Sequence, residues 1–85
     1  MDKFKYENQY WVGAWWKMTL ESAECHFIDD LCGNLDCYLN DEKINKSDDG
    51  SFYQSTLTME NGMKLEVEIY FDDEKEEWIC VAEEI

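Results

Sequence analysis

The sequence predicts an α+β domain in which an antiparallel sheet of about five strands has one main helix packed on one face. Two observations predict it. Apolar and polar residues alternate in several short runs, as in strands with one buried face, and one run repeats at helical spacing instead. A chain of 85 residues has enough apolar residues for one hydrophobic core and too few for two. We expect residues 1–85 to form a single domain with the element order β-β-α-β-β-β.

Two strands are expected before the helix. Phe4 and Tyr6 alternate with lysines, and the polar residues 7–9 provide a turn after them. From residue 10 to residue 20 the even positions are apolar, which favours a long second strand. Because this run is apolar on nearly every side, a helix is the competing interpretation.

The helix is expected to begin near Ser22, whose hydroxyl is placed to cap the first turn. Apolar residues then recur at helical spacing: Ala23, Phe27, Ile28, Leu31, Cys32, Leu35, Tyr38 and Leu39. Glycine costs about 1 kcal/mol relative to alanine inside a helix. A break at Gly33 into two short helices is therefore the alternative.

Three more strands are expected after a polar connection over residues 40–51. The first two flank Glu60-Asn61-Gly62, and the last is residues 78–82. A two-residue Asn-Gly loop would put the apolar faces of the flanking strands on opposite sides of the sheet. A three-residue loop with Gly62 in the left-handed region pairs Leu57 with Leu65 and keeps both faces together, so we expect this register.

The charge of the chain limits the classes of partner. Twenty-one acidic residues against seven lysines and no arginine give a net charge of −14. Direct binding to nucleic acid or to an anionic membrane requires lysine or arginine, so neither is expected. A hydrophobic content of 45% and an aromatic content of 15% predict a folded chain. The expected partner is a basic protein surface, although an acidic surface that only gives solubility is the simpler alternative.

The N-terminal residues contain no apolar signal segment, and no stretch approaches the length of a membrane span. We therefore expect a cytoplasmic protein. In that compartment the four cysteines are expected to be reduced.

Candidate catalytic and metal-binding residues are few. His26 lies on the polar side of the expected helix, without a nucleophile at a diagnostic spacing, and is expected to be a surface residue. Cys25, Cys32 and Cys37 have six and four residues between them, which does not match the paired ligands of structural zinc sites. Residues 45–56 have threonine where a calcium loop requires glutamate. No enzyme activity, cofactor or metal is expected.

The candidate partner-binding residues combine acidic side chains with two tryptophans. The acids lie on the expected helix (Asp29, Asp30, Asp36), on the outer side of a strand (Glu66, Glu68) and in the loop over residues 72–77 (Asp72, Asp73, Glu74, Glu76, Glu77). Trp11 and Trp15 fall opposite the expected core, where exposed aromatics would resemble a binding hot spot. Packing of both tryptophans under a second layer is the alternative.

These features favour a non-enzymatic inhibitor that binds a basic, nucleic-acid-binding protein such as a nuclease, presenting carboxylates where that protein expects phosphates. Antagonists that phages encode against CRISPR or restriction nucleases often have this composition, which would place the protein in a bacterial host cell. The analogy is one of composition only. The alternatives are a toxin-neutralising or subunit-docking protein that covers a basic surface without mimicry, and a divalent-cation-binding domain. The oligomeric state does not follow from the sequence.

Overall fold

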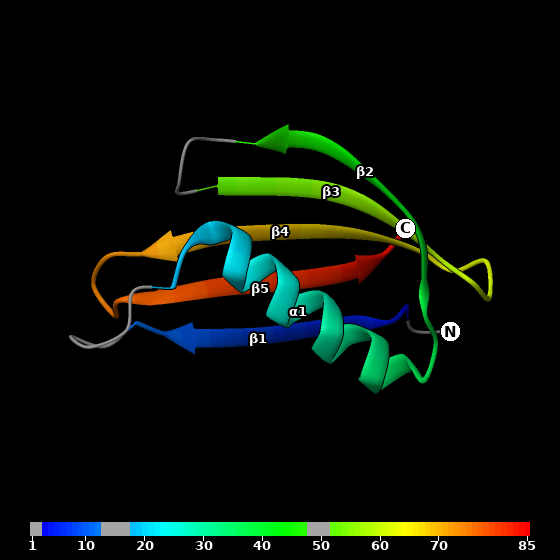
Figure 1. The fold of residues 1–85 in the computed structure, drawn as a ribbon, viewed down its shortest axis with the longest axis horizontal. Coiled ribbons are helices and arrows are strands. Elements are labelled where there is room, and N and C mark those ends of the chain that lie inside the picture. Colours follow the sequence, from blue (N-terminus) through cyan, green and yellow to red (C-terminus); the bar gives the residue numbers. More distant parts are fainter. Residues whose placement is uncertain (1–2, 13–17, 48–51) are drawn as a thin grey trace.

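The strands form one antiparallel sheet with the order β1-β5-β4-β3-β2 (Figure 1). The computed structural model describes residues 3–12, 18–47 and 52–85. Its elements are β1 (Lys5–Trp11), α1 (Leu20–Leu35), β2 (Leu39–Ser47), β3 (Phe52–Met59), β4 (Lys64–Asp72) and β5 (Glu77–Glu84). The predicted α+β class, with one helix packed on a five-stranded antiparallel sheet, is confirmed. The predicted order β-β-α-β-β-β is wrong, because the described order is β-α-β-β-β-β.

The error in the order comes from the N-terminal region. β1 runs straight through residues 7–9, where a turn was predicted. Asn8 lies on the helix side of this strand, and its amide donates to Asp30 Oδ2 on α1 (3.0 Å). A polar residue is tolerated there because the helix supplies its partner. The predicted strand over residues 10–20 is also wrong, since β1 ends at Trp11 and the helix begins at Leu20; residues 13–17 of that stretch lie outside the described part.

The helix is capped by Thr19 instead of Ser22. The Thr19 hydroxyl accepts a hydrogen bond from the backbone N–H of Ser22 (3.1 Å). The helix passes through Gly33 without a break and ends at Leu35, and Asp36 then adopts a left-handed conformation with φ of 51°. Tyr38 and Leu39, predicted as part of the helical stripe, therefore lie beyond the helix.

Most of the predicted polar connection is strand β2, which pairs with β3. Register shifts between Leu39 and Asp41 and between Ile44 and Lys46 interrupt the pairing. A sheet edge with bulges accommodates polar residues that a central strand would exclude, which is why the composition of this segment resembled a loop.

The β3–β4 hairpin has the predicted register, with Leu57 opposite Leu65. The Met59 N–H donates to the Met63 carbonyl (2.9 Å), which closes a three-residue loop. Gly62 has φ of +90°, a conformation that glycine adopts without the strain imposed by a Cβ.

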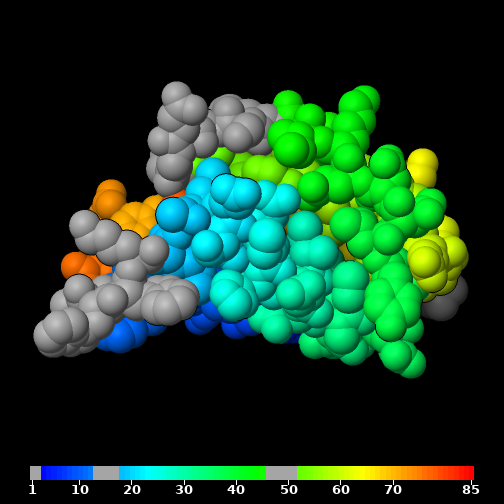
Figure 2. All heavy atoms as spheres, in the orientation of Figure 1, coloured from blue at the N-terminus to red at the C-terminus, as the bar shows by residue number. Residues whose placement is uncertain are grey.

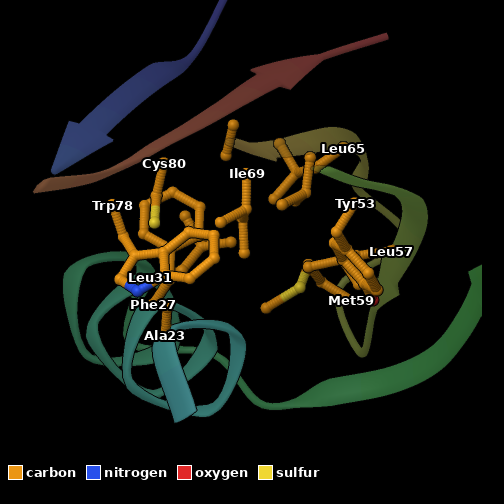
Figure 3. Close-up of a cluster of buried hydrophobic side chains, with 12 residues drawn as sticks. Ala23, Phe27, Leu31, Tyr53, Leu57, Met59, Leu65, Ile69, Trp78 and Cys80 are labelled. Atoms are coloured by element: carbon orange, nitrogen blue, oxygen red, sulfur yellow. The ribbon is translucent and has the colours of Figure 1, made fainter. Parts of the chain in front are cut away.

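The core lies between α1 and the concave face of the sheet (Figure 3). From the helix, Phe27 and Leu31 are fully buried, and the Phe27 ring stacks on Tyr6 of β1 with a centroid distance of 5.7 Å. On β5, Trp78 Nε1–H donates to the Met18 carbonyl (2.8 Å). This hydrogen bond attaches the residues that precede α1 to the sheet.

The opposite face of the sheet, turned away from the viewer in Figure 1, is not covered by the helix. Alternating residues of each strand point to it, because successive strand side chains lie on opposite faces. We call this surface the open face. Its members on the three strands beneath α1 are Lys5, Glu7, Gln9 and Trp11 of β1, Glu77, Ile79, Val81 and Glu83 of β5, and Lys64, Glu66, Glu68, Tyr70 and Asp72 of β4.

Candidate functional site

The residues predicted to bind a partner are divided among three parts of the molecule. Trp11, Glu66, Glu68, Asp72 and Glu77 lie on the open face. Asp29, Asp30 and Asp36 lie on or next to α1. Figure 2 shows the side of the molecule that carries α1, opposite the open face. Asp73, Glu74 and Glu76 form the exposed turn between β4 and β5, and Trp15 lies outside the described residues. The structure therefore does not join all the predicted acids into one patch.

Four glutamates gather at one end of the open face. Glu66 on β4 lies opposite Glu83 on β5. Val81, two residues before Glu83 on β5, lies between Glu68 of β4 and Glu7 of β1. Adjacent strands are about 4.8 Å apart, and alternate residues of one strand are about 6.8 Å apart. We call Glu7, Glu66, Glu68 and Glu83 the carboxylate zone, with Val81 at its centre.

Lys5 borders the carboxylate zone. Its Nζ lies 3.3 Å from Glu7 Oε1 and 3.5 Å from Glu83 Oε1. The hydrogen bond to Glu7, followed by the charges of Glu7 and Glu83, raises the pKa of Lys5 above its usual value. Lys64 lies two residues from Glu66 on the same side of β4, so two lysines border four carboxylates and the zone keeps a net negative charge.

A shallow hollow of about 80 Å³ lies within the carboxylate zone. It is lined by Glu66, Glu68, Glu83 and Val81. An apolar surface surrounded by carboxylates suits a side chain with an aliphatic stem and a cationic end, which describes lysine and arginine.

The other end of the open face carries three large apolar side chains among polar ones. Ile79 of β5 lies opposite Tyr70 of β4, and Trp11 of β1 is diagonal to Ile79. Trp11 is 67% exposed and Tyr70 is 42% exposed, so of the two alternatives for Trp11 the structure shows exposure and not packing under a second layer. We call Trp11, Tyr70 and Ile79 the aromatic zone.

Two of the predicted acids lie beside the aromatic zone. Glu77 lies between Trp11 and Asp72 in one cross-strand row. Asp72 also holds the β4–β5 turn, since its Oδ1 accepts the backbone N–H groups of Glu74 (3.0 Å) and Lys75 (3.3 Å). Part of the acidity of this turn therefore serves the local fold.

Asp30 joins the helix to β1. It accepts hydrogen bonds from the Tyr10 hydroxyl and the Asn8 amide. Burial, followed by the hydrogen bond to Asp30, raises the pKa of Tyr10. His26 is exposed as predicted, with its ring centroid 5.9 Å from that of Tyr10. Asp30 thus has a structural role between α1 and β1, and its part in partner binding stays a prediction.

Asp29 and Asp36 line a hollow of about 410 Å³ at the C-terminal end of α1, together with Cys32, Gly33, Cys37 and Tyr38. Asp36 is also the C-terminal cap residue of the helix. The Cys37 backbone N–H donates to the Cys32 carbonyl (3.1 Å), as in the motif that commonly ends helices. This hollow reflects the helix end.

A second carboxylate group connects α1 to β2. The Tyr53 hydroxyl donates to Glu24 Oε1 (3.1 Å) and contacts Glu42 Oε2. Burial is the largest cause that raises the pKa of Glu24, followed by the nearby Glu42 carboxylate. Sequence reasoning missed this group, because its members are far apart in the chain and each resembles an ordinary surface residue or core tyrosine.

The raised pKa of Glu24 predicts a pH dependence of stability. The folded state binds the Glu24 proton more tightly than the unfolded state, whose pKa is about 4.3. Proton binding by Glu24 therefore adds to the free energy of unfolding in full below that pH. This contribution is lost as the pH rises through the pKa of Glu24 in the folded state. We expect Glu24→Gln to raise the free energy of unfolding at pH 7 by less than about 1 kcal/mol, because solvent screens this half-exposed pair.

Urea unfolding between about pH 4.5 and pH 7 checks this expectation. Glu60→Gln, in the exposed hairpin turn, is the matched control because it removes the same charge. The slope of stability against pH should be shallower in Glu24→Gln than in Glu60→Gln. Equal slopes in the two variants would assign the dependence to net charge alone.

All four cysteines have free thiols: Cys25 is exposed, Cys32 and Cys37 are partly buried, and Cys80 is fully buried in the core. Within residues 3–12, 18–47 and 52–85, no three His, Cys, Asp or Glu side chains are arranged to hold a metal ion. The helix found in these ranges is not long and apolar enough to cross a membrane.

Sequence reasoning did not assign Glu7, Glu83, Tyr70 or Ile79 to the partner-binding residues. The sequence could have indicated the members on β5, because a strand that buries Trp78 and Cys80 directs the alternate residues Ile79 and Glu83 to the other face. No comparable signal existed for Glu7. Its position depends on the pairing of β1 with β5, which joins opposite ends of the chain.

The fold and surface together define an acidic α+β protein whose sheet has one covered face and one open face. Comparison with protein-family models, curated proteins and solved structures found no match.

Proposed function

We propose that this protein is a non-enzymatic inhibitor that binds a basic, nucleic-acid-binding protein and displaces DNA or RNA from it. The observation that supports the proposal is the carboxylate zone, where Glu7, Glu66, Glu68 and Glu83 converge on three adjacent strands. A rigid sheet holds these charges at short, regular intervals. Lysine and arginine side chains that bind phosphates also bind carboxylates.

The net charge of −14 supports the same function. Opposite charges accelerate the encounter of two proteins, and like charges repel nucleic acid from the inhibitor itself. A nuclease of a bacterial CRISPR or restriction system, bound by a phage-encoded inhibitor in the cytoplasm, is the partner class we propose first.

The exposed aromatic zone favours a second candidate, a toxin-neutralising or subunit-docking protein that covers a basic surface without competing with nucleic acid. Exposed aromatics surrounded by charge are typical of protein interfaces. The two candidates differ in one measurable property, which is the fate of nucleic acid bound to the partner.

The test has two stages. Affinity capture with the full chain from the native host, or from phage-infected cells, identifies a partner at low and at high salt. The purified partner is then loaded with fluorescent DNA or RNA, and displacement is followed by anisotropy while the acidic protein is added. Polyglutamate is the control for charge without a fold.

We expect displacement by the protein at concentrations where polyglutamate has no effect. The affinity should fall at least about tenfold between about 0.1 M and 1 M salt, because the screening length shortens from about 10 Å to about 3 Å. Salt-insensitive binding would contradict the mimic. Binding that leaves the nucleic acid in place would support the docking protein instead.

A further inference from the structure

We propose that the open face is the docking surface, and that its occupant is a protein segment with apolar side chains beside arginine or lysine residues. This inference rests on the proposed binding of a basic protein and assigns that binding to one side of the molecule. It does not require that nucleic acid be displaced.

The two faces of the sheet are used differently. α1 packs against one face and buries Phe27, Leu31 and Ala23 there. No helix in the described part of the chain covers the other face, and Trp11 and Tyr70 are left exposed on it. β5 separates these two residues, and Ile79 of β5 lies between them. Exposed apolar side chains gathered on one face are typical of interaction surfaces.

The carboxylate zone and the aromatic zone are adjacent. Val81 and Ile79 are alternate residues on the same side of β5, so the centres of the zones are about 6.8 Å apart. A partner segment that places an apolar side chain on Ile79 and Trp11 therefore brings its neighbouring residues to the carboxylates. This arrangement selects a partner that is both basic and apolar.

The hollow at Val81 gives the partner's basic residue a defined position. Its aliphatic stem would lie on Val81, and its cationic end would meet Glu66, Glu68 and Glu83. Arginine fits this position better than lysine, because its planar guanidinium can donate to two carboxylates at once. Two of these carboxylates already have partners within the chain, since Glu83 pairs with Lys5 and Glu66 accepts a hydrogen bond from Gln54 Nε2, and the basic residue of the partner would share them.

The helix side lacks this combination. Asp30 is engaged by Tyr10 and Asn8, and Asp36 caps the helix. Tyr38 is 74% exposed there, just beyond the helix, and it lines the hollow at the helix end with Cys32 and Cys37. The helix acids add to the long-range field and do not form a docking surface.

The test uses two short synthetic peptides of equal charge, one alternating arginine with leucine and one alternating arginine with serine. Each is titrated into the isotope-labelled full chain, and backbone amide signals are followed by NMR. We expect the arginine–leucine peptide to bind at least about tenfold more tightly. Its largest shifts should fall on β1, β5 and β4.

Two pairs of substitutions separate the faces while changing the net charge equally. The double variant Glu66→Gln and Glu68→Gln should weaken binding of the arginine–leucine peptide at least about tenfold. The matched pair Asp29→Asn and Asp36→Asn should change it less than about twofold. Trp11→Ala should weaken binding of the arginine–leucine peptide and leave that of the arginine–serine peptide unchanged. The amide spectrum of each variant reports whether it is folded.

Equal effects of the two pairs, or shifts centred on α1, would overturn the assignment of the open face. That result would leave the proposed inhibition intact, because displacement of nucleic acid is measured separately with the purified partner. Conversely, peptide binding on the open face without displacement would reject the inhibitor and retain the docking surface.

Discussion

Replacing Phe27 with alanine is expected to lower the free energy of unfolding by about 3–5 kcal/mol. Small domains have a total of about 5–15 kcal/mol, so this single change removes a large share. Phe27 is fully buried and stacks on Tyr6, so it joins α1 to β1. Truncation removes apolar area and leaves a cavity between helix and sheet.

Urea unfolding followed by far-UV circular dichroism measures the effect. Phe27→Leu is the matched variant, because it keeps much of the apolar volume and should cost about 1–2 kcal/mol. A loss below about 1 kcal/mol for Phe27→Ala would be inconsistent with a packed helix–sheet interface.

The second large effect is expected at Trp78. Trp78→Ala should cost about 3–5 kcal/mol, because the ring is buried and meets Phe71 edge-on at a centroid distance of 5.1 Å. The change also leaves the Met18 carbonyl without the indole N–H.

Trp78→Phe separates these two contributions. It keeps a ring beside Phe71 and removes the hydrogen bond, so we expect a cost of about 1–3 kcal/mol. Trp11→Ala is the exposed control and should change stability by no more than about 0.5 kcal/mol. The same unfolding experiment applies to all three variants. A similar cost for Trp78→Ala and Trp11→Ala would contradict the described burial.

The parts of the fold that the sequence predicted correctly depend on short-range signals. The β3–β4 register follows from alternation on either side of Gly62, whose conformation closes the loop. β1 was predicted as parts of two strands with a turn at residues 7–9 between them, because the reason that Asn8 can occupy an inward position is Asp30 on the helix. β2 was not recognised because its bulges and polar residues suit a sheet edge. Both depend on neighbours that are distant in sequence.

The candidate surface was predicted in part for the same reason. Glu66 and Glu68 follow from strand alternation, and the exposure of Trp11 from its position opposite the core. The helix acids carry the same charge but belong to the other side of the sheet. Composition counts charges without assigning them to a face, so it could not separate Asp30 from Glu66.

The edges of the sheet determine how the protein behaves when it is concentrated. On β1 the even-numbered residues bond to the C-terminal strand and its turn: the Phe4 carbonyl accepts from the Glu84 N–H, and the Val12 N–H donates to the Glu76 carbonyl. Because bonding alternates along an antiparallel pair, the odd-numbered residues direct their backbone N–H and carbonyl groups away from β5. The outward N–H of Gln9 is nevertheless occupied, because it donates to Asn8 Oδ1 (2.8 Å). At the other edge, the two register shifts of β2 disrupt a straight row of donors and acceptors. These two features interrupt the regular row of backbone groups with which a strand from another copy would pair, so they disfavour edge-to-edge association.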